Sequence, residues 1–162
     1  MPILTQRLIL APYTVGHAER MLAGAPTDDD HWAEGYPFAD ELDVARLYLR
    51  IVAEHGDPAP FGPYVVQLRE TGKAIGGLGF FGPPDAATGV VEFGYGLVPT
   101  VRGAGLATEA VIAALELTAE QGARVARADT TPANVASQRV MEKAGMTEVA
   151  RSAASVVYEV RF

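Results

Sequence analysis

Residues 90–109 read VVEFGYGLVPTVRGAGLATE, and the order of residue types in this stretch guides the interpretation of the whole chain. An apolar strand over Val90 to Val98 is broken at Pro99 by a glycine-containing turn, and a helix-forming run begins at Leu106. Glycines in a turn let the backbone come close to a ligand, and the first amides of a helix have no partner within it. A strand, a glycine turn and a helix in this order therefore predict an anion site, where free amides and the helix dipole hold a phosphate.

Two better-known phosphate motifs fit this turn less well. A P-loop needs Gly-Lys-Ser/Thr after its glycines, whereas Gly105 is followed by Leu106 and Ala107. A dinucleotide-binding fingerprint needs a third small residue where Thr108 stands, and an acidic residue about twenty positions later. Asp129 lies near that place, so this second motif is excluded less firmly than the first.

The turn resembles the acyl-CoA signature of the GNAT N-acetyltransferase superfamily, Arg/Gln-x-x-Gly-x-Gly/Ala, with Arg102, Gly105 and Ala107 at its defined positions. Residues 5–10, TQRLIL, resemble the first strand of the branch that contains the ribosomal-protein-alanine acetyltransferases. Residues 134–145, NVASQRVMEKAG, resemble the late helix of that branch. The three segments occur in the family's order and extend over nearly the whole chain.

The resemblance implies one GNAT domain over residues 1–162, of the α+β (α/β) class. Its expected sheet is mixed and mostly antiparallel, with about seven strands, about four flanking helices and one pair of parallel strands that splay apart. The residue patterns themselves predict strands over residues 5–11, 64–70, 73–81, 90–98, 124–130, 146–151 and 155–162. They predict helices over residues 15–25, between residues 40 and 56, over residues 106–121, and over a short run that ends at residues 144–145.

Composition limits the possible partners. A net charge of −7 and a sequence pI near 4.9 argue against nonspecific nucleic-acid binding and suit a cationic acceptor. No apolar run is long enough to span a membrane and the start, MPILTQRLIL, lacks a cleavable signal pattern, so we expect a cytoplasmic protein without a membrane partner. The absence of cysteine excludes disulfides and thiolate catalysis, and the three histidines are too scattered for a metal site, so no metal is expected.

Amide formation from acetyl-CoA needs an uncharged amine, and neutralising a lysine-like amine at pH 7 costs roughly 4.6 kcal/mol. Glu92 is the candidate general base, because a half-buried carboxylate on the strand that leads to the turn would have a raised pKa. The resemblance implies a glutamate at this point in many relatives. The alternative is that Glu92 pairs with an arginine on an exposed strand face.

The departing thiolate needs a proton or a hydrogen bond, for which much of the superfamily uses a tyrosine in the late helix. No tyrosine occurs between Tyr95 and Tyr158. The resemblance implies that Ser137 contacts the sulfur instead. The alternative for Ser137 is a structural role, in which it satisfies backbone donors in the first turn of the helix.

The turn and the resemblance together predict two kinds of contact with acyl-CoA. Backbone groups would pair with pantetheine like an added strand, and basic side chains would supply local positive charge for the polyanionic cofactor. The predicted contact residues are Leu97, Val98, Arg102, Gly103, Ala104, Gly105, Leu106, Ala107, Thr108, Asn134, Arg139 and Lys143. Asn134 has a second interpretation as the N-cap of the late helix.

The resemblance implies that the acceptor site is covered by an acidic and aromatic segment, in which Asp28-Asp29-Asp30 precedes Trp32, Tyr36 and Phe38. The alternative for the aspartates is a solvated loop. The predicted reaction is direct attack by a primary amine in a ternary complex, and that amine can be a protein N-terminus or a small-molecule amine. The rival function is a non-catalytic acyl-CoA-binding module, and the family makes a homodimer possible.

Overall fold

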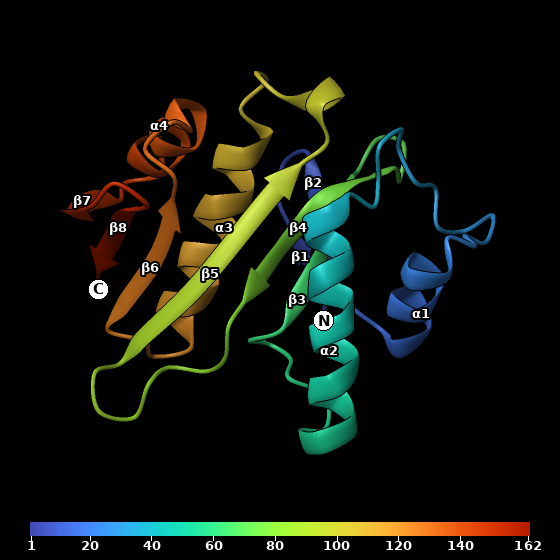
Figure 1. The fold of residues 1–162 in the computed structure, drawn as a ribbon, viewed down its shortest axis with the longest axis horizontal. Helices are drawn as coiled ribbons and strands as arrows, with labels where there is room; N and C mark the ends of the chain where they lie inside the picture. Colours follow the sequence, from blue (N-terminus) through green and yellow to red (C-terminus); the bar gives the residue numbers. More distant parts are fainter.

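The computed structural model describes residues 1–162, which form one sheet with helices on both faces (Figure 1). The strands are β1 (Ile3–Leu4), β2 (Leu8–Pro12), β3 (Pro63–Leu68), β4 (Ala74–Phe80), β5 (Val90–Leu97), β6 (Val125–Thr130), β7 (Thr147–Arg151) and β8 (Val156–Arg161). The helices are α1 (Val15–Ala23), α2 (Ala39–His55), α3 (Leu106–Glu120) and α4 (Val135–Lys143), with a 3-10 turn at Pro99–Val101. The strand order is β1-β2-β3-β4-β5-β6-β8-β7.

The sheet has eight strands, where the prediction was about seven. The additional strand is β1, which pairs antiparallel with β2 through Ile3 opposite Leu10 and Leu4 opposite Ile9. The turn between them is closed by the amide of Thr5, which donates to the carbonyl oxygen of Leu8 at 3.0 Å. A strand of two residues is too short for a period-2 pattern to reveal it.

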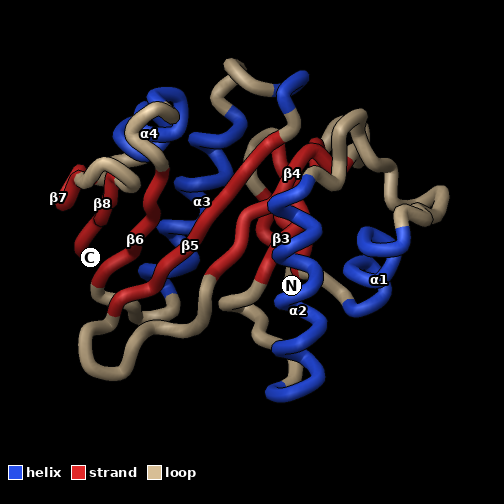
Figure 2. The backbone as a smooth tube through the Cα atoms, in the orientation of Figure 1, coloured by secondary structure: helices blue, strands red, loops and turns tan.

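The sheet is mixed, and β5 and β6 are its one parallel pair. Residues 90–92 of β5 pair with residues 125–127 of β6, but β5 continues to Leu97 and β6 to Thr130 without pairing with each other. The two strands diverge beyond this point, as Figure 2 shows. The expected splayed pair is therefore present, and it leaves backbone groups of β5 free on the side that faces β6.

The two faces of β5 differ in side-chain size, which determines what each face can hold. Val91 and Phe93 are each 1% exposed and belong to the core, to which α3 contributes Val111. Gly94 and Gly96 lie on the opposite face, the side on which α2 is placed (Figure 1). One face of the strand is thus filled with apolar side chains, while the other is kept open.

No helix of the molecule is both long and apolar enough to cross a membrane.

Candidate functional site

The turn before α3 presents a group of free backbone donors. Gly103 and Gly105 have φ angles of 86° and 80°, in the left-handed region that glycine adopts without strain. Gly105 is the N-cap of α3, and no side chain caps the helix. The first helical hydrogen bond runs from the amide of Glu109 to the carbonyl of Gly105 at 3.1 Å, so the amides of residues 106–108 have no partner. These amides lie at the positive end of the helix dipole, where the sequence predicts an anion site.

Arginine side chains hold this turn from two sides. Arg102 folds back and donates from Nε and Nη2 to the carbonyl oxygen of Leu97, at 3.1 and 2.9 Å. Arg7 donates from Nη1 to the carbonyl of Ala104 at 2.8 Å and pairs with Glu109 at 2.7 Å. The partnership of Arg7 and Glu109 was not predicted, because these residues are 102 positions apart. The carbonyls of Leu97 and Ala104 are thus held in place by guanidinium groups.

The two residues expected to pair with pantetheine are both engaged within the protein. The carbonyl of Leu97 accepts from Arg102, and the amide of Val98 donates to the carbonyl of Ile75 on β4 at 2.8 Å. The backbone of residues 93–96 has no β6 partner. Leu97 also lies beyond the last pair of β5 with β6, so the free edge extends to the first of the two residues that the sequence indicated.

Ser137 lies at the start of α4, beside a tyrosine that was not predicted. Asn134 caps this helix, because its Oδ1 accepts from the amide of Ser137 at 3.1 Å. The hydroxyl of Ser137 is 2.7 Å from the hydroxyl of Tyr95, which also lies 3.2 Å from the Ser137 carbonyl oxygen. The bond joins β5 to α4, and burial raises the pKa of Tyr95, which keeps the phenol protonated at neutral pH. The late helix contains no tyrosine, and the phenol beside Ser137 comes from β5.

Glu92 forms an ion pair on an exposed part of the sheet. Its side chain is 54% exposed, and its Oε1 is 3.3 Å from Nη1 of Arg127 on β6. Arg127 also pairs with Glu159 on β8 at 2.6 Å. Glu92 lies on the same face of β5 as Gly94 and Gly96, two and four residues before them. Phe81 lines both the hollow that contains Glu92 and the larger groove next to it.

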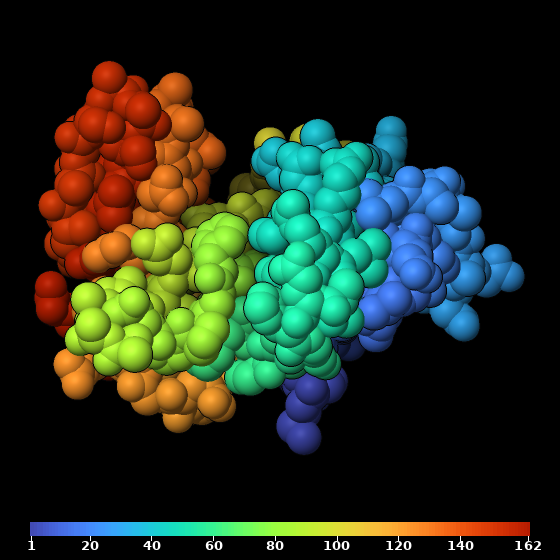
Figure 3. Space-filling view, turned by 60° about the horizontal axis from the view of Figure 1, so that its bottom comes forward, coloured from blue at the N-terminus to red at the C-terminus, as the bar shows by residue number.

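A groove of about 990 Å³ lies between α2, the loop of residues 56–63 and the open face of β4 and β5. Figure 3 shows a hollow between α2 (teal) and the green segment around residues 80–90. Apolar and aromatic side chains from both sides line it, including Val44, Leu47, Ile51, Phe61, Phe80 and Phe81. Phe38 is part of this lining, so one of the three predicted acceptor aromatics lies at the groove.

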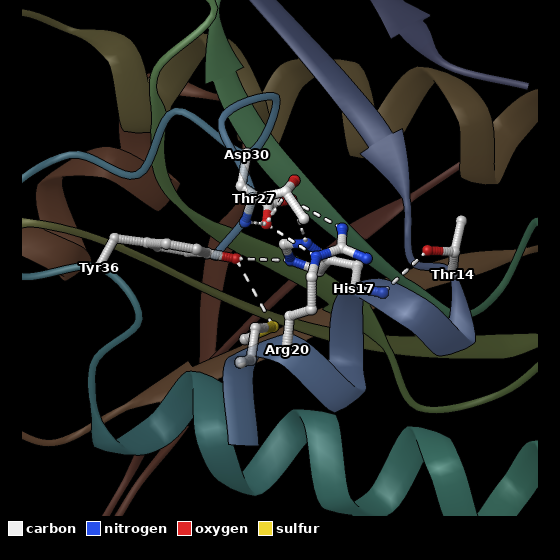
Figure 4. A network of polar contacts seen from close by, with 7 residues as sticks. Thr14, His17, Arg20, Thr27, Asp30 and Tyr36 are labelled. Carbon is white, nitrogen blue, oxygen red and sulfur yellow. Dashed lines mark hydrogen bonds and ion pairs between the residues drawn. The ribbon is translucent and has the colours of Figure 1, made fainter. Parts of the chain in front are cut away.

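The other two aromatics pack beside α1, outside the groove lining. Trp32 forms a bridge with Ala74, and its ring contacts that of Tyr36 edge to face at 5.9 Å. Tyr36 is 6% exposed, and its hydroxyl is 3.1 Å from Nε2 of His17 (Figure 4). Burial lowers the pKa of His17. Both aromatics therefore belong to a packed cluster next to α1.

The three consecutive aspartates divide into two kinds. Asp28 and Asp29 are exposed, as a solvated loop would be. Asp30 is buried and accepts two hydrogen bonds from Arg20, at 2.8 and 2.7 Å, and one from the amide of Thr27 at 2.8 Å (Figure 4). The bonds from Arg20 hold the pKa of Asp30 well below its usual range. Asp30 thus anchors the segment that precedes α2.

Glu41, one of the acidic residues between Asp28 and Asp43, is a buried carboxylate at the groove. It is 6% exposed, and its Oε2 accepts from the hydroxyl of Tyr13 at 2.7 Å. A Cβ on Gly77 would collide with this carboxylate, so the glycine makes room for it. Burial raises the pKa of Glu41 to about 7. The only available signal was a glutamate in the first turn of a helix, where acidic residues are common for another reason.

Arg139 and Lys143 lie four residues apart on α4; both are exposed and form no ion pair. They are therefore available to a polyanion, although no contact joins either of them to the glycine turn. No group of three or more histidine, aspartate or glutamate side chains could hold a metal ion.

Comparison with known families decides how this arrangement is interpreted. The family model described as Acetyltransferase (GNAT) domain matches residues 7–147. The chain belongs to the GNAT acetyltransferases. It is an acyltransferase of a family that typically binds acetyl-CoA or CoA, and the free amides of the glycine turn and the open edge of β5 fit such a cofactor. No curated protein sequence is significantly similar to this acetyltransferase.

Solved structures share the fold of this acetyltransferase at low sequence identity. An acetyltransferase from Agrobacterium tumefaciens is 24% identical with a TM-score of 0.68, over 100% of this chain and 95% of the other. RimJ of Mycobacterium smegmatis, in complex with CoA-disulfide, is 18% identical with a TM-score of 0.67, over 95% of this chain and 81% of the other. The ribosomal-protein-S5-alanine acetyltransferase of Vibrio fischeri is 14% identical with a TM-score of 0.67, over 99% and 96%.

Proposed function

We propose that this acetyltransferase moves the acetyl group of acetyl-CoA to a primary amine by direct attack in a ternary complex. The observation that carries the proposal is the position of three features along one strand. The free amides of residues 106–108 follow β5, the unpaired edge of β5 borders the gap to β6, and the Tyr95–Ser137 hydroxyl pair lies beside that gap. A phosphate, an extended pantetheine arm and a thioester sulfur can be held in that order.

In the proposed reaction the amine nitrogen forms a bond to the thioester carbon while the carbon–sulfur bond breaks. Glu92 takes the proton of the amine, directly or through water, and the Tyr95–Ser137 pair donates a hydrogen bond to the departing thiolate. The chain contains no cysteine that could carry the acetyl group between two half-reactions. The acceptor is a protein N-terminus or a small-molecule amine, and the ribosomal-protein-S5-alanine acetyltransferase of Vibrio fischeri gives a precedent for a protein acceptor.

A second candidate function is binding of acyl-CoA without catalysis. The ion pair between Glu92 and Arg127 favours it, because the carboxylate is already engaged by a guanidinium on an exposed part of the sheet and would have to leave that pair to reach an amine. The two functions predict the same affinity for acetyl-CoA, so only turnover separates them.

The test is release of CoA thiol from acetyl-CoA in the presence of a panel of primary amines, with Glu92→Gln as the variant. The protein has no thiol of its own, so a thiol reagent reports the product alone. We expect Glu92→Gln to lower the rate roughly 10²-fold or more. The loss should be largest below the pKa of the amine, with the affinity for CoA unchanged.

Glu54→Gln, an exposed change on α2 with the same loss of charge, is the control. An unchanged pH–rate profile in Glu92→Gln would remove Glu92 from the mechanism. CoA binding without turnover on any amine would favour the binding module.

A further inference from the structure

One side of α2 forms a wall of the groove. Val44, Leu47 and Ile51 are spaced three and four residues apart, so they share one side of the helix, and all three line the groove. Leu47 is 38% exposed, and Phe81 on the opposite wall is 66% exposed. A continuous apolar surface of this kind in a monomer marks a place where a ligand or partner is bound.

The floor of the groove reaches the strand that would carry the acyl donor. Gly94 and Gly96 of β5 line it and present no side chains there. A Cβ on Gly96 would lie 3.2 Å from the ring of Phe38, and one on Gly94 would lie 3.5 Å from the ring of Phe81. The two glycines therefore let aromatic rings approach the backbone of β5, and they connect the groove to the proposed point of transfer.

The charges around the groove favour a cation. Its lining includes the carboxyl groups of Asp40, Glu41 and Asp57 and the imidazole of His55, and it contains no lysine or arginine. Glu41 uses Oε2 to accept from Tyr13, and its Oε1 accepts no hydrogen bond. An ammonium group would find carboxylate partners here, whereas a carboxylate would meet only like charge and apolar surface.

We propose that this groove binds the acceptor, and that the acceptor is a small-molecule primary amine with an apolar body of about the size of an aromatic ring. The proposal rests on the proposed N-acetyltransferase function and names the substrate class for that site. The groove volume of about 990 Å³ is in the range of small-molecule sites.

A peptide is a poorer fit, because its amide groups would need hydrogen-bond partners along the groove. The hydroxyls of Tyr48 and Tyr64 already donate to the carbonyls of Tyr13 and Pro60. Peptide amides buried against the remaining apolar walls would lose their bonds to water without replacement. The lining therefore favours an acceptor whose only polar group is its amine.

The test compares four acceptors by thiol release: 2-phenylethylamine, phenylalanine, spermidine and the peptide amide Phe-Gly-Gly-NH₂. Phenylalanine adds a carboxylate to 2-phenylethylamine, and spermidine has positive charge without an apolar body. The peptide amide presents a peptide N-terminus with the same aromatic ring. We expect kcat/KM for 2-phenylethylamine to exceed each of the others at least about tenfold. A higher value for spermidine, phenylalanine or the peptide would overturn the inference while leaving the acetyltransferase function intact.

A matched pair of variants tests the location. Leu47→Arg places a cation on the groove wall at a position that is already partly exposed, and Ala53→Arg places the same residue elsewhere on α2. Leu47→Arg should raise KM for 2-phenylethylamine at least about tenfold and leave KM for acetyl-CoA unchanged. Ala53→Arg should change neither constant. Equal KM values for 2-phenylethylamine in Leu47→Arg and wild type would place the acceptor site elsewhere.

Direct binding separates failure of this inference from failure of the proposed function. Ligand-observed NMR with the CoA-loaded protein should show 2-phenylethylamine bound to wild type and not to Leu47→Arg. Binding in the groove without thiol release from any of the four amines would overturn the proposed transferase function. Absence of binding together with turnover of another amine would overturn only the substrate class.

Discussion

At the scale of single residues, Tyr95 adds a phenol to a site for which a serine alone was predicted. Its hydroxyl lies 2.7 Å from that of Ser137, and burial raises the pKa of Tyr95 above its usual value near 10. A thiol has a pKa of about 8.5, so complete proton transfer from this phenol to a thiolate is unfavourable. The pair is suited to donating a hydrogen bond to the sulfur, either from Tyr95 directly or through a Ser137 hydroxyl that Tyr95 orients.

We predict that Tyr95→Phe lowers kcat roughly 10- to 100-fold and leaves the dissociation constant of CoA within about twofold. The phenyl ring keeps its packing, so stability should fall by only about 1 kcal/mol for the lost hydrogen bond. Ser137→Ala should have a similar effect, and the double variant should be little slower than either single variant, because the two hydroxyls act together. Additive losses would show that the two residues act independently, and an unchanged kcat in Tyr95→Phe would assign it a structural role only.

At the scale of elements, the start of α3 is fixed by parts of the chain that lie far away in sequence. Glu109 in the first helical turn accepts from Thr5, from the amide of Arg7 and from the Arg7 guanidinium, at 2.6, 2.7 and 2.7 Å. The turn between β1 and β2 is thereby fastened to α3 next to Gly105. The free amides at this helix end keep one orientation, which reduces the cost of ordering them around a phosphate.

We predict that Ala104→Glu raises the dissociation constant of CoA by roughly tenfold or more at low salt, because the new carboxylate competes for the free amides and repels the phosphates. Ala104 is exposed, and only its backbone carbonyl contacts Arg7, so the fold should be kept. Isothermal titration calorimetry at two salt concentrations measures the effect, which should shrink as salt rises. Ala87→Glu adds the same charge to an exposed loop and serves as the control. If both variants bound CoA like wild type, the anion site would lie elsewhere.

At the scale of the whole molecule, the position of α2 over the sheet creates the groove and also buries Glu41. This carboxyl has a pKa of about 7 in the folded protein, against an ordinary value of 4.5. The folded state therefore binds the proton more tightly than the unfolded state. The contribution of Glu41 to the stability of the protein is greatest when its carboxyl group is protonated. That contribution declines as the pH rises from about 4.5 through about 7.

We predict a change in the difference between the free energies of unfolding of wild type and Glu41→Gln. This difference, wild type minus variant, should fall by about 2 kcal/mol between pH 5 and pH 8. Glutamine stays neutral, so the variant lacks this contribution, while every other titrating group is common to both proteins. Urea unfolding at several pH values measures the difference, and Glu54→Gln on the exposed side of the same helix should keep the wild-type slope. A difference that did not change with pH would mean that the Glu41 carboxyl titrates alike in both states.

The local parts of this protein could be predicted from its sequence. The strand, glycine turn and helix of residues 90–109, the helix cap at Asn134, and the unpaired amides of residues 106–108 lie where the sequence indicated. Such features depend on residues that are neighbours in sequence or share one period of a helix or strand. Backbone geometry then determines which side chain or amide lies where, whatever the rest of the chain does.

The partners across the fold were decided only by the tertiary structure. Tyr95 and Ser137 are 42 positions apart, Arg127 is 35 positions from Glu92, and the carboxylate of Glu41 lies against Gly77 on another element. Periodicity tells on which face of its own element a side chain lies, but it does not tell which face of which other element packs against it. For that reason Glu92 was predicted to be half-buried and is exposed. The apolar spacing along α2 likewise did not tell that Val44, Leu47 and Ile51 border an open groove.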